Sequence, residues 1–107
     1  MGITAGALTE AVYYILLSLL QPMHGYGIMQ NVERLSGGRL KLAAGTLYGA
    51  ISTMLEKDWI TALDGAGDSR RKEYVITDAG RQILHAEFLR LKELVDNGRA
   101  ALEGEEA

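Results

Sequence analysis

The sequence predicts a mainly α-helical fold with one small β-hairpin, and three phrases met in chain order support this prediction. Residues 24–36, HGYGIMQNVERLS, are typical of a helix, and residues 45–60, GTLYGAISTMLEKDWI, are typical of a helix that leads into a strand. Residues 68–84, DSRRKEYVITDAGRQIL, indicate a basic turn, a second strand and another helix. This order of elements is that of a winged helix-turn-helix, which is the fold we expect.

The composition indicates one small intracellular domain. A chain of 107 residues, of which 48% are hydrophobic, supports a single modest core. The absence of cysteine excludes disulfides and thiolate metal sites and fits a reducing compartment. The most apolar stretch, residues 11–20, is too short to span a bilayer, and the N-terminus lacks the basic residues of a secretory signal. We therefore expect a soluble, cytoplasmic protein without membrane contact.

Two helices are expected in the N-terminal part. Apolar side chains recur at helical spacing over residues 8–20, and they cover nearly all faces of that helix, so a second covering surface is needed. A second helix is expected to open with Gly25 and Gly27 in its first turn and to stop before the glycines at 37 and 38. Residues 39–42 alternate between polar and apolar types, which predicts a short strand.

The remaining elements follow in turn. A third helix is expected from about residue 44 to about residue 57, and a hairpin from strands at 60–63 and 72–76. Thr77 is placed to cap a fourth helix that extends to about residue 102. We therefore expect a winged helix-turn-helix region over 1–76, a dimerisation helix over 77–102 and an acidic tail over 103–107, all in one compact domain without a separate effector domain.

The fourth helix carries the pattern of a two-stranded coiled coil. Its apolar positions, with one glycine, are separated by 4, 3, 4, 3 and 4 residues from Leu84 to Leu102. This spacing predicts a homodimer in which the fourth helix, helped by the first, packs against its symmetry mate. The alternative is that the stripe docks on the chain's own first helix. The expected dimer contacts are Leu16, Leu84, Phe88, Leu91, Val95 and Leu102.

The formal net charge of −3 is unevenly distributed. Residues 39–72 hold six basic and four acidic side chains, whereas residues 73–107 hold four basic and eight acidic ones. A basic part can contact phosphates while an acidic part serves assembly, because binding depends on the local field. Ordinary solvated surface charge is the alternative explanation.

The three phrases resemble the PadR family of bacterial transcription regulators. The family shares the HGY opening, the G-T-L-Y start of a recognition helix and an R-[RK]-x-Y-x-[IL]-T-x-x-G exit from the wing, and the resemblance covers residues 9–102. It implies a homodimeric repressor that binds an inverted-repeat operator with half-sites about 10 bp apart. This chain has Gly49 where the family usually has proline.

The resemblance places the DNA-reading surface on the third helix and the wing. Short polar side chains at the start of a helix suit base reading in the major groove, and a wing arginine suits phosphates or the minor groove. For Tyr48, packing under the wing is the alternative. The expected DNA contacts are Lys41, Gly45, Thr46, Tyr48, Ser52, Arg70, Arg71 and Lys72.

Several family members bind apolar aromatic or drug-like molecules between the first and fourth helices of the dimer. By this resemblance, a small apolar effector would be lined here by Tyr13, Leu17, Phe88 and Val95, although the same residues would also make an adequate dry core. We recognise no metal-ligand spacing, nucleophile elbow, phosphate-binding glycine loop or catalytic carboxylate pair, so we expect no enzymatic activity, metal or cofactor.

A competing class of function stays open at this point. A winged-helix module used for protein contact or assembly, without DNA binding, would explain the acidic balance and the apolar first helix equally well. It would leave the basic run at residues 70–72 and the polar face of the third helix without a role.

Overall fold

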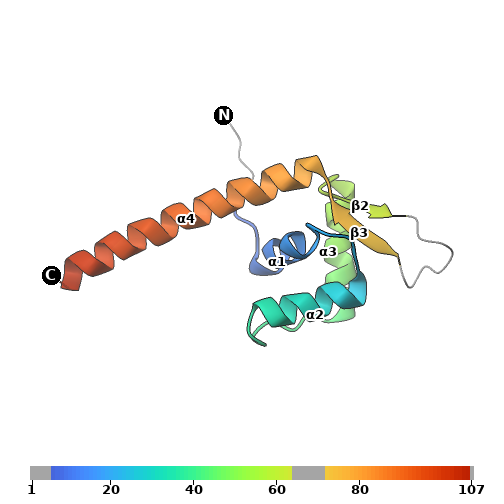
Figure 1. The fold of residues 1–107 in the computed structure, drawn as a ribbon, viewed down its shortest axis with the longest axis horizontal. Coiled ribbons are helices and arrows are strands. Elements are labelled where there is room, and N and C mark those ends of the chain that lie inside the picture. The colour runs from blue at the N-terminus through green and yellow to red at the C-terminus, as the bar shows by residue number, and fades with distance from the viewer. Residues whose placement is uncertain (1–5, 64–71, 107) are drawn as a thin grey trace.

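The computed structural model describes the backbone of residues 6–63 and 72–106, and it confirms the predicted fold class (Figure 1). The described chain is mainly helical with a three-stranded antiparallel sheet of order β1-β3-β2. The elements, in chain order, are α1 (Glu10–Ser18), β1 (Met23–His24), α2 (Gly25–Leu35), α3 (Ala44–Glu56), β2 (Ile60–Leu63), β3 (Glu73–Ile76) and α4 (Asp78–Glu106).

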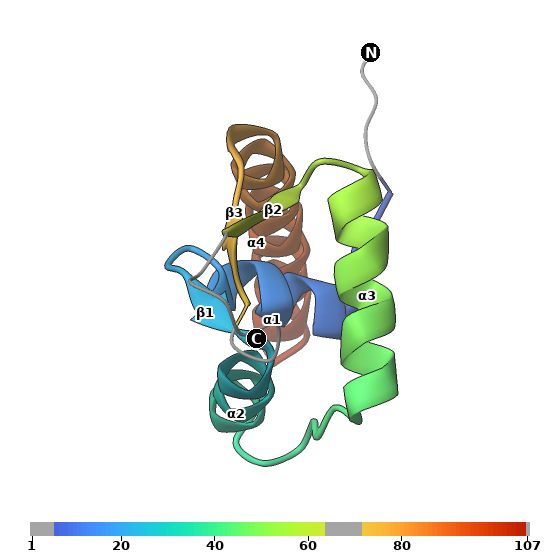
Figure 2. The same ribbon diagram turned by 90° about the vertical axis from the view of Figure 1, so that its right-hand side faces the viewer.

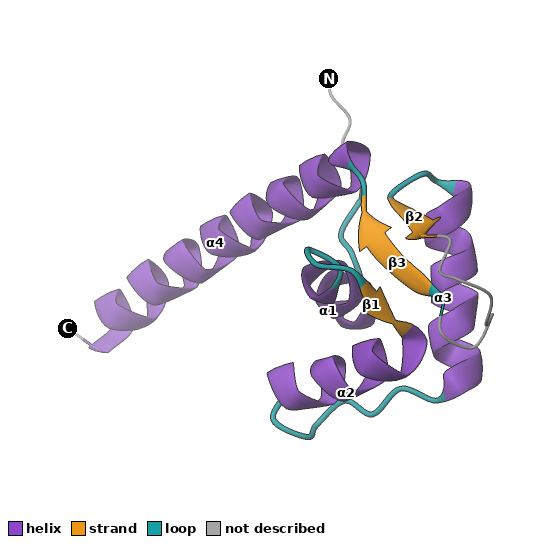
Figure 3. Ribbon diagram, turned by 45° about the vertical axis from the view of Figure 1, so that its right-hand side comes forward, coloured by secondary structure: helices purple, strands orange, loops and turns teal. Residues whose placement is uncertain are grey.

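The sheet contains the predicted hairpin and one strand that the sequence did not predict. β2 and β3 pair with Ile60 opposite Ile76, and β1 pairs with the other edge of β3 through Met23 opposite Tyr74 (Figure 3). The predicted strand at residues 39–42 is wrong. The Ser36 hydroxyl at the end of α2 accepts a hydrogen bond from the Leu40 N–H (2.9 Å), so this backbone is tied to the helix instead of to the sheet.

The ends of α1 and α2 have identifiable causes. The Thr9 hydroxyl accepts a hydrogen bond from the Val12 N–H (3.1 Å) and caps α1, which is shorter than the predicted 8–20. The Leu19 carbonyl accepts a hydrogen bond from the Ile76 N–H (2.8 Å), so the chain turns from the helix towards β3. α2 ends before Gly37 and Gly38, whose φ angles of 64° and 84° lie in the left-handed region that favours glycine.

The core lies where the three short helices meet the sheet, and α1 occupies the centre of the end-on view in Figure 2. One face of α2 and one face of α3 supply it, as the helical spacing predicts, whereas α1 is buried or half-buried over residues 11–18. None of the helices in the described part of the chain has the length and apolarity that crossing a membrane requires. The buried hydrophobic residues are Ile15, Leu16, Leu19, Ile28, Val32, Leu47, Ile51, Met54, Ile60, Tyr74, Ile76 and Leu84.

α4 begins against the sheet and then extends well beyond the rest of the molecule (Figure 1). Thr77 caps it as predicted, because its hydroxyl accepts a hydrogen bond from the Gly80 N–H (3.0 Å) and donates one to the Asp58 carbonyl (2.6 Å). Its 29 residues span about 44 Å. The helix continues through Gly104 to Glu106, past the predicted end at residue 102, so most of the acidic tail is helical.

Candidate nucleic-acid interface

α3 has one buried face and one exposed face, as its sequence pattern predicts. Leu47, Ile51 and Met54 are at most 2% exposed and anchor the helix in the core. The opposite face carries Thr46 and Ser52, which are exposed, and it includes glycines at 45 and 49. Among the described residues, no side chain caps the start of the helix at Ala43, so first-turn N–H groups remain available to an acceptor from outside.

Tyr48, in the second sequence phrase, packs against Gly25, in the first phrase. A Cβ atom added at Gly25 would lie only 2.1 Å from the Tyr48 hydroxyl oxygen, so the phenol rests against the start of α2. Burial raises the pKa of Tyr74 on β3, and the nearby Tyr48 phenol raises it further. Tyr48 is nevertheless 45% exposed. The side chain therefore packs against its own chain while part of it faces solvent.

His24 has a structural role in the HGY phrase. Its Nδ1 accepts a hydrogen bond from the Gly27 N–H (3.0 Å) and caps α2. A nitrogen acceptor at this position takes the part that a serine or aspartate oxygen usually plays. The arrangement explains the histidine without any chemical function.

The basic residues have different surroundings. Lys41 and Lys72 are exposed, whereas Arg70 and Arg71 lie outside the described residues. The guanidinium of Arg39 forms hydrogen bonds with both carboxylate oxygens of Glu10, which ties the loop before α3 to the start of α1. These hydrogen bonds lower the pKa of the Glu10 carboxyl below its ordinary value. No local pattern in the chain indicates this long-range pair.

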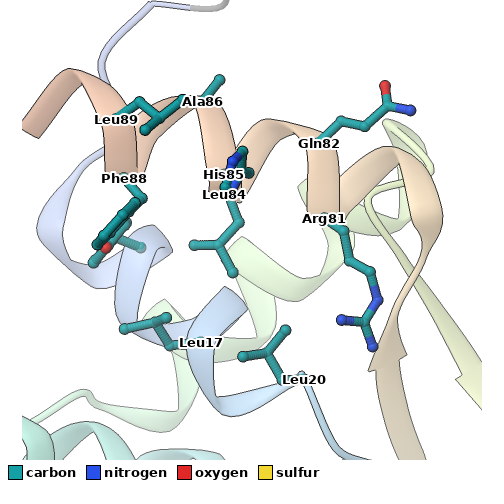
Figure 4. Close-up of a pocket in the computed structure, with 10 residues that line it drawn as sticks. Leu17, Leu20, Arg81, Gln82, Leu84, His85, Ala86, Phe88 and Leu89 are labelled. Atoms are coloured by element: carbon teal, nitrogen blue, oxygen red, sulfur yellow. The ribbon is translucent and has the colours of Figure 1, made fainter.

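A groove of about 700 Å³ lies between α1 and α4 (Figure 4). Three of the four predicted effector contacts, Tyr13, Leu17 and Phe88, line it, whereas Val95 lies further along α4 and does not. The remaining apolar wall comes from Leu20, Leu84 and Leu89, with Arg81, Gln82, His85 and Ala86 completing the lining.

The predicted dimer contacts fall into two sets. Leu16 and Leu84 are 0% and 7% exposed because they belong to the core of the chain itself, and Leu91 is half-buried. Phe88, Val95 and Leu102 are at least half exposed, and Leu89 and Leu94 share this exposure. Leu84 therefore belongs to the chain's own core, whereas Phe88, Val95 and Leu102 present apolar side chains to solvent.

Sequence reasoning missed a buried carboxylate on α4. The Glu87 side chain is only 5% exposed and accepts two hydrogen bonds of 2.7 Å from Arg90 and one of 3.2 Å from the Leu8 N–H. The Arg90 hydrogen bonds hold the pKa of the Glu87 carboxyl below its ordinary value, against the opposing effect of burial. Within residues 6–63 and 72–106, no three histidine or acidic side chains are grouped so that they could hold a metal ion.

The arrangement of two packed helices, a hairpin and an exposed polar face on the second of those helices defines a winged helix-turn-helix protein. A family model described as the transcriptional regulator PadR-like family matches residues 15–86. The chain belongs to this family, which is one of transcriptional regulators and not of enzymes.

Solved structures share the fold. A PadR family regulator from Eggerthella lenta is 26% identical, with a TM-score of 0.70 over 86% of this chain and 80% of that one. A PadR family regulator from Clostridium difficile is 22% identical, with a TM-score of 0.67 over 85% and 97%. Bacillus subtilis PadR, solved in complex with operator DNA, is 20% identical, with a TM-score of 0.59 over 71% and 45%.

A curated relative matches only part of the chain. It is a 37.1 kDa protein in transposon TN4556 of Streptomyces fradiae, 38% identical over 66 residues. The match covers 62% of this chain and 18% of the relative's length.

Proposed function

We propose that this protein is a sequence-specific DNA-binding repressor that acts as a homodimer on an inverted-repeat operator. The observation that carries the proposal is the exposed, polar face of α3, whose opposite face is buried in the core through Leu47, Ile51 and Met54. An α-helix with this profile fits the major groove. Bacillus subtilis PadR, which shares the fold, forms a complex with operator DNA, and this supports DNA as the target. A chromosomal operator would place the protein in the cytoplasm.

Separate residues would supply specificity and affinity. Thr46, Tyr48 and Ser52 are exposed on α3, together with the backbone at Gly45, and would approach base edges and neighbouring phosphates. Arg70, Arg71 and Lys72 at the wing, with Lys41 before α3, would neutralise phosphates whatever the sequence. Tyr48 would also hold the start of α2 in register with α3, since it packs on Gly25.

The dimer would form through α4. Its outer turns expose Phe88, Val95 and Leu102, and an isolated helix with such a stripe is poorly stable in water without a partner. The apolar groove beside Tyr13 and Leu17 is continuous with this stripe through Phe88. A small apolar effector in the groove would change the angle of α4, and with it the distance between the two recognition helices, and so release the operator.

The proposal is tested by measuring duplex affinity as a function of salt for the wild type and two kinds of variant. Thr46→Ala with Ser52→Ala should change the preference among duplex sequences. Arg70→Ala with Arg71→Ala should weaken binding to all duplexes and lower the salt dependence. The matched control is Lys92→Ala with Arg99→Ala, which removes two positive charges from α4, away from α3 and the wing. Because both residues flank the proposed dimer stripe, sedimentation checks that the control still dimerises, and its two properties should then stay near the wild type.

Three results would count against DNA reading. They are the absence of a preferred sequence, an affinity independent of salt, and equal effects of the control and the wing variants. Salt-independent self-association together with these results would favour the protein-contact module instead.

A further inference from the structure

The side-chain inventory of α3 limits which bases it can read. The helix is described over its full length, and its thirteen residues include no arginine, lysine, asparagine or glutamine. Arginine and lysine are the side chains that read guanine with two hydrogen bonds, and asparagine and glutamine read adenine in the same way. α3 therefore lacks both of the common means of reading a purine edge.

The exposed residues of α3 offer methyl groups instead. Thr46, Gly49 and Thr53 lie at spacings of three and four, which places them along one face of the helix, and all three are exposed. The Thr53 hydroxyl donates a hydrogen bond to the Gly49 carbonyl (3.2 Å), so its proton is used within the helix. What remains for a partner at Thr53 is a methyl group and an oxygen acceptor.

Gly49 keeps the surface between the two threonines low. A Cβ atom added there would meet nothing of the described chain within 4 Å, so packing against those residues does not require glycine. In the major groove, the group that apolar side chains recognise is the 5-methyl of thymine. A low surface flanked by two threonine methyl groups lets such a methyl approach the helix closely.

We propose that α3 reads thymine, through contact of the Thr46 and Thr53 methyl groups with thymine 5-methyl groups on either side of Gly49. The inference rests on the proposed function, since it names the chemistry by which the same surface selects its operator. Base pairs beneath α3 are then mainly A·T, with guanine carrying little of the recognition in this part of the half-site.

The test begins with an operator selected from random duplexes, in which single thymines of the half-site are then replaced by deoxyuridine. This replacement removes the 5-methyl group and leaves base pairing intact. Loss of a buried methyl contact should weaken binding about fourfold at each contacted position. Replacing guanines of the same half-site by 7-deazaguanine, which removes the N7 acceptor, should change affinity less than about twofold.

Two variants of one residue assign the contact. Thr53→Val keeps a methyl group and removes the hydroxyl, so it should retain the sensitivity to deoxyuridine. Thr53→Ser keeps the hydroxyl and removes the methyl group, so one deoxyuridine position should lose its effect. Thermal unfolding of each variant checks that the fold is unchanged.

The outcomes separate the inference from the proposed function. A selected operator that is insensitive to deoxyuridine and loses binding about tenfold with 7-deazaguanine would overturn thymine reading and leave operator binding in place. Failure to select any sequence would overturn the proposed function itself, and the inference with it.

Discussion

A methyl group placed at position 25 should disturb the contact that joins α2 to α3. In Gly25→Ala, the new Cβ atom would lie 2.1 Å from the Tyr48 hydroxyl oxygen and 2.7 Å from the carbon that bears it. An ordinary contact begins near 3.4 Å, so the phenol must retreat by about 1.3 Å. Because the ring is partly exposed it can move, and we expect a loss of stability of about 1–3 kcal/mol.

A double-mutant cycle measured by urea unfolding tests this reasoning. In a Tyr48→Ala background the clash is gone, and Gly25→Ala should then stabilise by about 0.4–1 kcal/mol because alanine restricts the unfolded chain. Gly45→Ala is the matched control, since a Cβ atom there meets no described residue within 4 Å. Equal costs of Gly25→Ala in both backgrounds, within about 0.5 kcal/mol, would refute the proposed contact.

Three other substitutions test the supports of the fold. Gly80→Ala should destabilise by about 3 kcal/mol in thermal unfolding, because its Cβ atom would lie 2.0 Å from the Trp59 carbonyl oxygen, a backbone atom that cannot rotate away. An unchanged melting temperature would contradict this placement of α4. His24→Ala should cost about 1 kcal/mol through loss of the α2 cap, and His24→Asn should recover part of it; equal losses would argue against capping. Glu87→Gln should destabilise most at neutral pH. Because the Arg90 hydrogen bonds lower the pKa of the Glu87 carboxyl in the folded protein, its charge stabilises the fold fully above the ordinary pKa of glutamate. This stabilisation is lost as the pH falls through the lower pKa of the folded state, so the free energies of unfolding of the two proteins should converge below about pH 4. A constant difference at all pH values would show that the carboxylate charge is not involved.

The elements that the sequence predicted well are those with a strong local signal. α3 has three buried residues at helical spacing, and the two β-prone runs of the hairpin pair as strands β2 and β3. Strand β1 has two residues, Met23 and His24, and so short a segment carries no periodicity. The alternation of polar and apolar residues at 39–42 wrongly predicted a strand, because the Leu40 N–H donates its hydrogen bond to the Ser36 hydroxyl and not to a neighbouring strand.

Features of the candidate site that depend on distant residues could not be predicted. Glu87 lies among charged residues of a helix, yet its side chain is buried, and it accepts a hydrogen bond from the Leu8 N–H, 79 positions earlier in the segment before α1. The contact of Tyr48 with Gly25 likewise involves residues that are distant in the sequence, so no local pattern predicts it. The chemical character of the α3 face could be read directly, because helical spacing alone determines which residues share it.

The most direct measurement is selection of bound fragments from a random duplex library by the purified protein at near-physiological salt, followed by sequencing. If the protein is a sequence-reading homodimer, we expect an enriched inverted repeat with half-sites about 10 bp apart. Within each half-site, the base pairs that face α3 should be mainly A·T. Enrichment of no sequence, with only weak and salt-sensitive binding, would contradict the proposal that α3 reads DNA.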